Sequence, residues 1–143
     1  MTIDVIIDSS ILRSYKSGNP YSQKLIHSCI DEEINIGISS LSLINIWKNE
    51  GFDRKSEIGF TSLLDFLTVQ DLSTRDAMEI GTYIRSYNQT AITISNRDIE
   101  ILHTIVLSIS SKCDVVTENP LHYTDLGYEY HVIDIQSYLN KAI

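Results

Sequence analysis

Short apolar, β-branched runs alternate along this chain with longer segments of helical periodicity, and this alternation restricts the fold more than any other feature of the sequence. The short runs are typical of buried strands, while apolar residues spaced at i, i+3, i+4 and i+7 indicate amphipathic helices. Strands that alternate with helices predict an α/β domain with a mainly parallel sheet and right-handed crossovers. The predicted strands are residues 3–7, 34–38, 114–117 and 131–133, and the predicted helices are residues 20–33, 55–67, 74–88 and 97–110.

The length and charge of the chain limit the classes of protein to which it can belong. Its 143 residues suit one domain over residues 1–143, because no linker or internal repeat divides them. The 11 basic and 19 acidic residues give a formal charge of −8, which argues against broad, non-specific capture of nucleic acid. An enzyme that acts on nucleic acid is still allowed if its acids gather in one metal site.

The cysteines and the apolar runs indicate the compartment. Two cysteines are too few for a disulfide scaffold or a zinc site. No apolar run approaches the roughly 18 residues of a membrane span. The first residues already include an acid, unlike a secretory signal peptide. We therefore expect a cytoplasmic protein that makes no contact with a membrane.

Two acids stand at positions where chemistry collects in an α/β fold. Asp8 follows the predicted first strand directly, and in a parallel sheet the carboxyl ends of the strands border the binding crevice. The simpler interpretation of Asp8 is a helix N-cap. Asp98 opens the predicted helix 97–110 on its apolar face, where it either complements the helix dipole or meets a metal or partner that offsets its burial.

A polar turn ends the third predicted strand. Thr117 closes the strand 114–117, and Asn119 precedes a proline, so both are expected at the same edge as Asp8. Plain turn chemistry explains the Asn-Pro pair equally well.

Four short motifs occur in order along the chain. A hydrophobic strand ends in an acid and small hydroxyl residues at 5–12, and a second strand ends in serine before a helix at 36–45. An acid opens a helix at 96–101, and a strand closes on Thr-x-Asn and an aromatic residue at 113–123. Over residues 3 to about 135, these motifs resemble those of the PIN-domain nucleases, which include the toxin half of many prokaryotic toxin–antitoxin pairs. The resemblance implies a three-layer α/β/α fold with a mainly parallel central sheet.

The same resemblance implies a metal-dependent endoribonuclease whose acids bind Mg²⁺ or Mn²⁺ in one pocket. Carried over residue by residue, Asp8 and Asp98 would be the metal ligands, and Thr117 would orient Asp8 or a metal-bound water. Ser9 would lie at the lip of the pocket. The metal would lower the pKa of a bound water and stabilise charge on the phosphate that is cut. RNA as the substrate, an antitoxin-like protein partner and a homodimer are implied as well.

The site departs from the family pattern at two of its acidic positions. The pattern has Glu six residues after the strand-ending Ser39, where this chain has Asn45, and it commonly has Asp where this chain has Asn119. Both asparagines join the expected catalytic set, because an amide oxygen can ligate a metal although it carries no charge. The nearest acid is Glu50, which lies about 140° around a helix from Asn45 and does not substitute for it directly, although a helix that ends near Gly51 would allow it to replace the missing acid.

These departures leave alternative functions open. A site with only two carboxylates can hold one hydrated ion, and we expect it to give a weak nuclease. The alternative is a degenerate PIN-like domain that binds RNA or a protein partner without cleavage, and Asn45 and Asn119 favour it. A response-regulator-like signalling domain is a third class, but it needs a lysine at the end of a later strand, and Lys112 precedes a strand.

Several further side chains near the motifs could contact RNA. His122 follows the turn after Thr117 and is a candidate for substrate contact. Tyrosines can stack on bases and basic side chains can meet phosphates, although core edges and a solvated face explain the same residues. The tyrosines are Tyr15, Tyr21, Tyr123 and Tyr128, and the basic residues are Arg13, Lys16, Lys48, Arg54 and Lys55.

Overall fold

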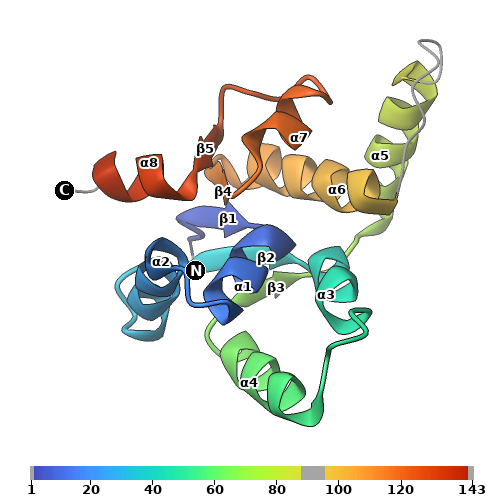
Figure 1. Cartoon of the computed structure of the whole chain (residues 1–143). Helices are drawn as coiled ribbons and strands as arrows, with labels where there is room; N and C mark the ends of the chain where they lie inside the picture. The colour runs from blue at the N-terminus through green and yellow to red at the C-terminus, as the bar shows by residue number, and fades with distance from the viewer. Residues whose placement is uncertain (1, 88–95, 142–143) are drawn as a thin grey trace.

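The structure, a computed structural model, describes residues 2–87 and 96–141, and these contain one all-parallel sheet of five strands (Figure 1). The order across the sheet is β3-β2-β1-β4-β5, so β1 is the central strand. Ile7 in β1 lies opposite both Ile38 and Val116, and the carboxyl ends of β1, β2 and β4 therefore meet at one edge. The strands are β1 (Val5–Ile7), β2 (Ile36–Ser39), β3 (Thr68–Gln70), β4 (Asp114–Thr117) and β5 (Val132–Asp134).

Helices cover both faces of the sheet and give three layers (Figure 1). Residues of α1, α2, α3, α4 and α8 form one hydrophobic cluster with the sheet, and residues of α5, α6 and α7 form the other. Among the described helices, none is long and apolar enough to cross a membrane. The helices are α1 (Ser9–Lys16), α2 (Pro20–Ile30), α3 (Ser40–Trp47), α4 (Arg54–Leu64), α5 (Thr74–Tyr87), α6 (Asn96–Ser111), α7 (Pro120–Thr124) and α8 (Ile135–Lys141).

The strands are apolar on both faces because each face is covered by helices. Successive side chains of a strand point to opposite faces. Val116 accordingly packs in the cluster around α1 and α2, and its neighbour Val115 packs in the cluster around α6 and α7. All three residues of β1 are buried, and burial of side chains of this size contributes roughly 1.5–3 kcal/mol each. β1 is thereby fixed at the centre of the sheet, directly below Asp8.

The predicted α/β fold with a parallel sheet is confirmed, and each of the four predicted strands is present. β3 was not predicted, because Thr68-Val69-Gln70 is a half-buried edge strand with one apolar residue. The helices α7 and α8 are too short for their periodicity to be read from the sequence.

One predicted helix ends early because a residue just beyond it adopts a left-handed backbone. The predicted helix 20–33 ends at Ile30, because Glu32 has a φ of 62° and starts a tight reversal. The amides of Glu32 and Glu33 then donate to the carbonyls of Cys29 and Ser28, which satisfies the last turn of the helix. Residues 88 and 95, predicted as a helix end and a cap, lie outside the described residues.

Candidate active site

Asp8 comes directly after β1 and lies at the centre of a hydrogen-bond network. Its Oδ1 accepts from the backbone N of Ser10 at 3.1 Å and from the Ser10 hydroxyl at 2.5 Å, so Asp8 is the N-cap of α1. Its Oδ2 accepts from Thr117 Oγ1 at 2.7 Å and from the Tyr123 hydroxyl at 2.6 Å. A carboxylate offers about four lone-pair positions, and these four donors account for all of them. The Asp8 side chain is 5% exposed.

The donors to Asp8 are fixed in their roles by their own partners. The backbone N of Glu118 donates to Ser10 Oγ, and the backbone N of Asn119 donates to Thr117 Oγ1. Both hydroxyl oxygens therefore accept from the backbone and turn their own hydrogens toward the carboxylate. Thr117 occupies the end of β4, next to β1, as the strand pattern predicts.

Tyr123 has a role that the sequence interpretation missed. It is fully buried, so it does not stack on an RNA base, and that expectation is wrong for this residue. Burial raises the pKa of Tyr123 well above its ordinary value, and the charge of Asp8 raises it further. The hydroxyl therefore stays protonated and continues to donate to Asp8.

The second acid at the site is Glu100, on α6. Ser9 Oγ donates to its carboxylate, at 2.6 Å from Oε1 and 2.9 Å from Oε2, and Asn45 Nδ2 donates to Oε2 at 3.0 Å. The Glu100 side chain is 4% exposed. Burial raises the pKa of Glu100, and the negative charge of Asp8 raises it further. Asp8 and Glu100 are thus a coupled pair of buried acids.

Glu100 was missed because Asp98, two residues earlier, opens the helix. Two helical residues subtend about 200°, so Asp98 and Glu100 project from different sides of α6. The contacts with Ser9 and Asn45 are made by Glu100, whereas Asp98 is a buried residue of the first turn. A signal was present in the sequence: Glu100, Thr104 and Ser108 form a buried polar stripe at i, i+4 and i+8, which is unusual for a core-facing helix side.

The remaining predicted site residues lie as follows. Asn45 on α3 points to Glu100, so the structure brings it together with Asp8 and Thr117 around one site. Asn119 precedes α7 and is exposed, and its side chain makes no capping hydrogen bond. Glu50 lies beyond the end of α3 on the surface.

One cation borders the two acids. Nη1 of Arg13, one turn along α1, donates to Ser9 Oγ at 3.1 Å, and the same Ser9 oxygen is bonded to Glu100. The Arg13 side chain is exposed, so its guanidinium lies on the open side of the site.

The donor set fits one hydrated divalent ion. The described residues contain no group of three or more His, Cys, Asp and Glu side chains placed to hold a metal ion. Two coupled carboxylates and the Asn45 amide oxygen nevertheless suit a single Mg²⁺ or Mn²⁺ that keeps several waters. The raised pKa of Glu100 shows that the negative charge at this place is poorly compensated, and a cation would relieve it. Asp8 would have to release one of its four donors to ligate such an ion.

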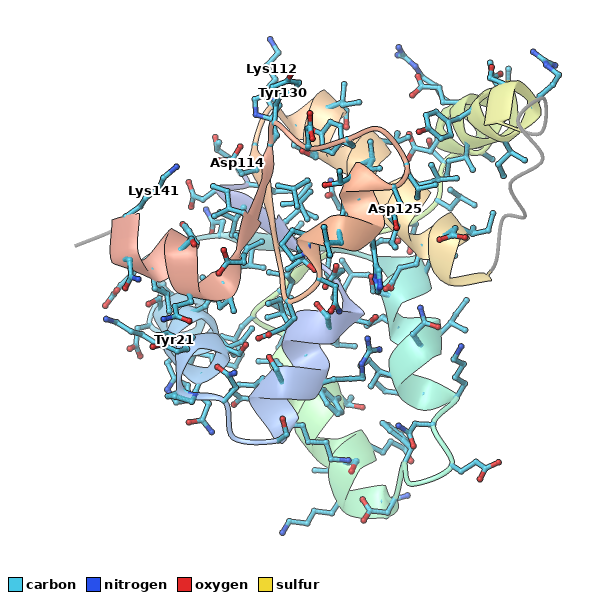
Figure 2. All side chains as sticks on the ribbon, turned by 45° about the horizontal axis from the view of Figure 1, so that its top comes forward. Tyr21, Lys112, Asp114, Asp125, Tyr130 and Lys141 are labelled. Atoms are coloured by element: carbon cyan, nitrogen blue, oxygen red, sulfur yellow. The ribbon has the colours of Figure 1, made fainter. Side chains whose placement is uncertain are left out.

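The opposite edge of the sheet carries a different set of side chains. Figure 2 shows Lys112, Asp114 and Tyr130 together near the amino ends of β4 and β5. Asp114 Oδ1 lies 3.2 Å from Nδ1 of His131 at this edge. Asp8 and Glu100 lie instead at the carboxyl edge of the sheet, which is the edge where open parallel sheets bind ligands.

Comparison with known proteins supports the fold. No protein-family model matches the sequence, and no curated protein is similar enough to count as a relative. Among solved structures, the crystal structure of VapBC2 from Rickettsia felis bound to a DNA fragment from their promoter matches at 19% identity and a TM-score of 0.65. The match covers 92% of this chain and 98% of that chain. DNA-bound VapBC from Salmonella typhimurium matches at 16% identity and a TM-score of 0.65, over 94% of this chain and 99% of that chain. The resemblance drawn from the four sequence motifs is thereby confirmed at the level of the fold: over nearly its whole length, this chain has the PIN-domain fold found in VapBC toxin–antitoxin complexes.

Proposed function

We propose that this chain is a PIN-type endoribonuclease that cuts RNA with one Mg²⁺ or Mn²⁺ ion, and that Asp8 and Glu100 are the acidic ligands. The buried pair formed by these two carboxylates carries the proposal, because burial and the charge of Asp8 both raise the pKa of Glu100. Burial of uncompensated acids costs free energy, which a protein accepts where the acids serve a ligand. All-oxygen ligation at the carboxyl edge of a parallel sheet favours Mg²⁺ or Mn²⁺.

The residues of the site have separate roles in this reaction. When bound, the ion would supply positive charge that stabilises the phosphate and favours deprotonation of water. Asp8 is held in one orientation by Ser10, Thr117 and Tyr123, and one of these donors would have to give up its place to the ion. Glu100, which Ser9 and Asn45 hold beside Asp8, would be the second carboxylate on the ion. The Arg13 guanidinium, on the open side of the site, would contact the phosphate.

A comparison of three acid variants tests the assignment. Asp8→Asn and Glu100→Gln should abolish Mn²⁺-dependent cleavage of single-stranded RNA, because each removes a ligand charge. Asp98→Asn, a change of the same size two residues away, should retain most of the activity. Loss of cleavage in Asp98→Asn together with activity in Glu100→Gln would restore Asp98 as the ligand and refute the present assignment.

The second candidate function is an RNA-binding or protein-binding module without cleavage. Two observations favour it: Asn45 brings no charge to the site, and Asp8 already has four donors. A binding module would bind RNA equally well with the metal and with EDTA, and it needs no Mn²⁺ of its own. Calorimetric titration with Mn²⁺ therefore separates the candidates. Saturable Mn²⁺ binding that disappears in Asp8→Asn would support the nuclease.

We also propose an antitoxin-like protein partner and a homodimer. The structural neighbours are VapBC complexes, described as bound to DNA, which supports the proposal of a partner for this chain. A partner that reaches the coupled acids would present basic side chains, because acidic ones would be repelled by a surface of net charge −8. Sedimentation that shows only a 16.2 kDa species at high concentration would contradict the dimer.

A further inference from the structure

We propose that a groove along α1 and α4 binds a single strand of RNA beside the acids, with Arg13, Lys16 and Lys55 on its phosphates and Phe52 against one of its bases. The inference rests on the proposed ribonuclease function and names the path of its substrate.

Two adjoining hollows form the groove. The first has a volume of about 380 Å³ and lies between α1, α3 and α4, and the second has a volume of about 420 Å³ and continues along α1 and α4. They share Lys16 and Phe60. Glu100 lines a third hollow that shares Asn45 with the first, and Asn45 donates to Glu100, so one end of the groove lies beside the acidic site. A substrate that lies in the groove would therefore extend to the two acids.

The charge of the groove is opposite to that of the whole chain. Three cations line it, Arg13, Lys16 and Lys55, against the single acid Asp53, whereas the chain has 11 basic and 19 acidic residues. Within the described residues, none of the three cations forms an ion pair at contact distance, and Lys16 interacts with Asp53 only at longer range. Arg13 and Lys16 are three residues apart on α1 and so share a face. This concentration of unpaired positive charge on an acidic protein suits a polyanion.

Lys16 is held where it can meet a phosphate. Its Nζ donates to Ser56 Oγ at 2.5 Å and lies 6.0 Å from the centroid of the Phe60 ring. The Lys16 side chain is exposed, so the charge remains accessible at the junction of the two hollows. The carboxylate of Asp53 caps α4 by accepting from the backbone N of Ser56, so the one acid of the groove is bound to the first turn of the helix.

Aromatic rings line the first hollow beside the cations. The rings of Phe52 and Phe60 are nearly parallel, with an interplanar angle of 15° and centroids 6.2 Å apart, and Trp47 supports Phe52 at 4.9 Å. Phe52 is half-buried, while Phe60 belongs to the core, so Phe52 is the ring placed to stack on a base. Stacking on side chains requires bases that are not paired in a duplex, which selects single-stranded RNA. A basic protein segment suits the acids themselves but would be repelled along the groove by its three cations.

The test measures how a fluorescent single-stranded oligouridine binds to the full chain, by anisotropy in EDTA over a range of KCl concentrations. Each phosphate contact on a single strand contributes about 0.7 to the slope of log K against log salt. The double variant Lys16→Ala, Lys55→Ala should therefore reduce the slope by about 1.4. Phe52→Ala should weaken binding about tenfold and leave the slope unchanged, because stacking carries no charge.

The matched control is the double variant Lys24→Ala, Lys141→Ala, which changes the net charge by the same amount. Lys141 projects from the end of α8, away from α1 and α4 (Figure 2), and Lys24 is exposed on α2. The control should keep the parental slope. An equal decrease in both double variants would mean that only the net charge matters, and the proposal would be wrong.

The remaining outcomes separate this inference from the proposed function. Binding that depends on the groove, in a chain that cleaves no RNA, would support the groove and reject the nuclease. Cleavage with a salt slope that Lys16 and Lys55 do not affect would reject the groove alone. Binding of polyglutamate in place of oligouridine, lost in the Lys16, Lys55 variant, would assign the groove to an acidic protein partner and overturn the proposal.

Discussion

Removal of the Tyr123 hydroxyl should weaken the fold and strengthen metal binding at once. In Tyr123→Phe, Asp8 loses a donor at 2.6 Å, and no donor is left unpaired because the hydroxyl itself is gone. Hydrogen bonds to charged groups contribute about 1.5–3 kcal/mol to the free energy of unfolding. A domain near this size loses about 2–4 °C of melting temperature per kcal/mol, so we expect a decrease of roughly 3–12 °C.

The same variant should bind Mn²⁺ more tightly than the parent. Its Asp8 retains three donors, those from Ser10 and Thr117, and one lone pair of Oδ2 becomes available to a cation. Mn²⁺ should therefore raise the melting temperature more in Tyr123→Phe than in the parent, through linkage of binding to folding.

Tyr128→Phe is the matched control for this measurement. The Tyr128 hydroxyl lies 2.8 Å from Ser108 Oγ, a neutral partner, so its loss should cost only about 0.5–1.5 kcal/mol and leave metal binding unchanged. Differential scanning fluorimetry with and without Mn²⁺ gives both quantities. Equal destabilisation in the two variants, or weaker Mn²⁺ binding in Tyr123→Phe, would refute the view that Tyr123 competes with a cation for Asp8.

Three more predictions concern the groups around the site. Glu100→Gln should raise the free energy of unfolding at pH 7 without metal, because the folded state raises the pKa of this carboxyl and so penalises its charged form. Urea denaturation should show that this gain vanishes below about pH 4, where the carboxyl is protonated in both the folded and the unfolded parent. Asn45→Glu should place a third carboxylate beside Glu100, and calorimetry should show tighter Mn²⁺ binding together with a lower melting temperature of the metal-free protein. His103 is buried between Ser39 and Asp76, and burial lowers its pKa. The free energy of unfolding of the parent should therefore fall as the pH drops below about 6.5, and in the same urea assay that of His103→Gln should depend less on pH over this range.

The sequence predicts the parts of this molecule that follow from period and position. Asp8 and Thr117 could be located because each ends a short apolar run, and adjacent parallel strands bring such ends together. Asn45 is located through the resemblance to PIN-domain nucleases, whose pattern has Glu six residues after the strand-ending serine, here Ser39.

Glu100 and Tyr123 could not be located in the same way, because their roles depend on tertiary contacts. Both are buried polar residues whose sequence neighbours are apolar or turn residues. Glu100 is selected over Asp98 by the rotation of α6 against α1 and α3, for which the polar stripe that Glu100 begins is the one local sign. Tyr123 lies on a five-residue helix, too short to show a periodicity.

Two of the hydrogen-bond donors to Asp8 lie more than 100 residues later in the sequence, and this affects how the site forms during synthesis of the protein. Thr117 and Tyr123 follow Asp8 by 109 and 115 residues, and β4, one of the two neighbours of β1, lies in the same late segment. A nascent chain elongates at about 5–20 residues per second, and these contacts can form only after β4 and, for the last of them, residue 123 have left the ribosome. A chain assembled in this order would complete the network around Asp8 only after the segment through residue 123 has been synthesised, 115 residues after Asp8 itself.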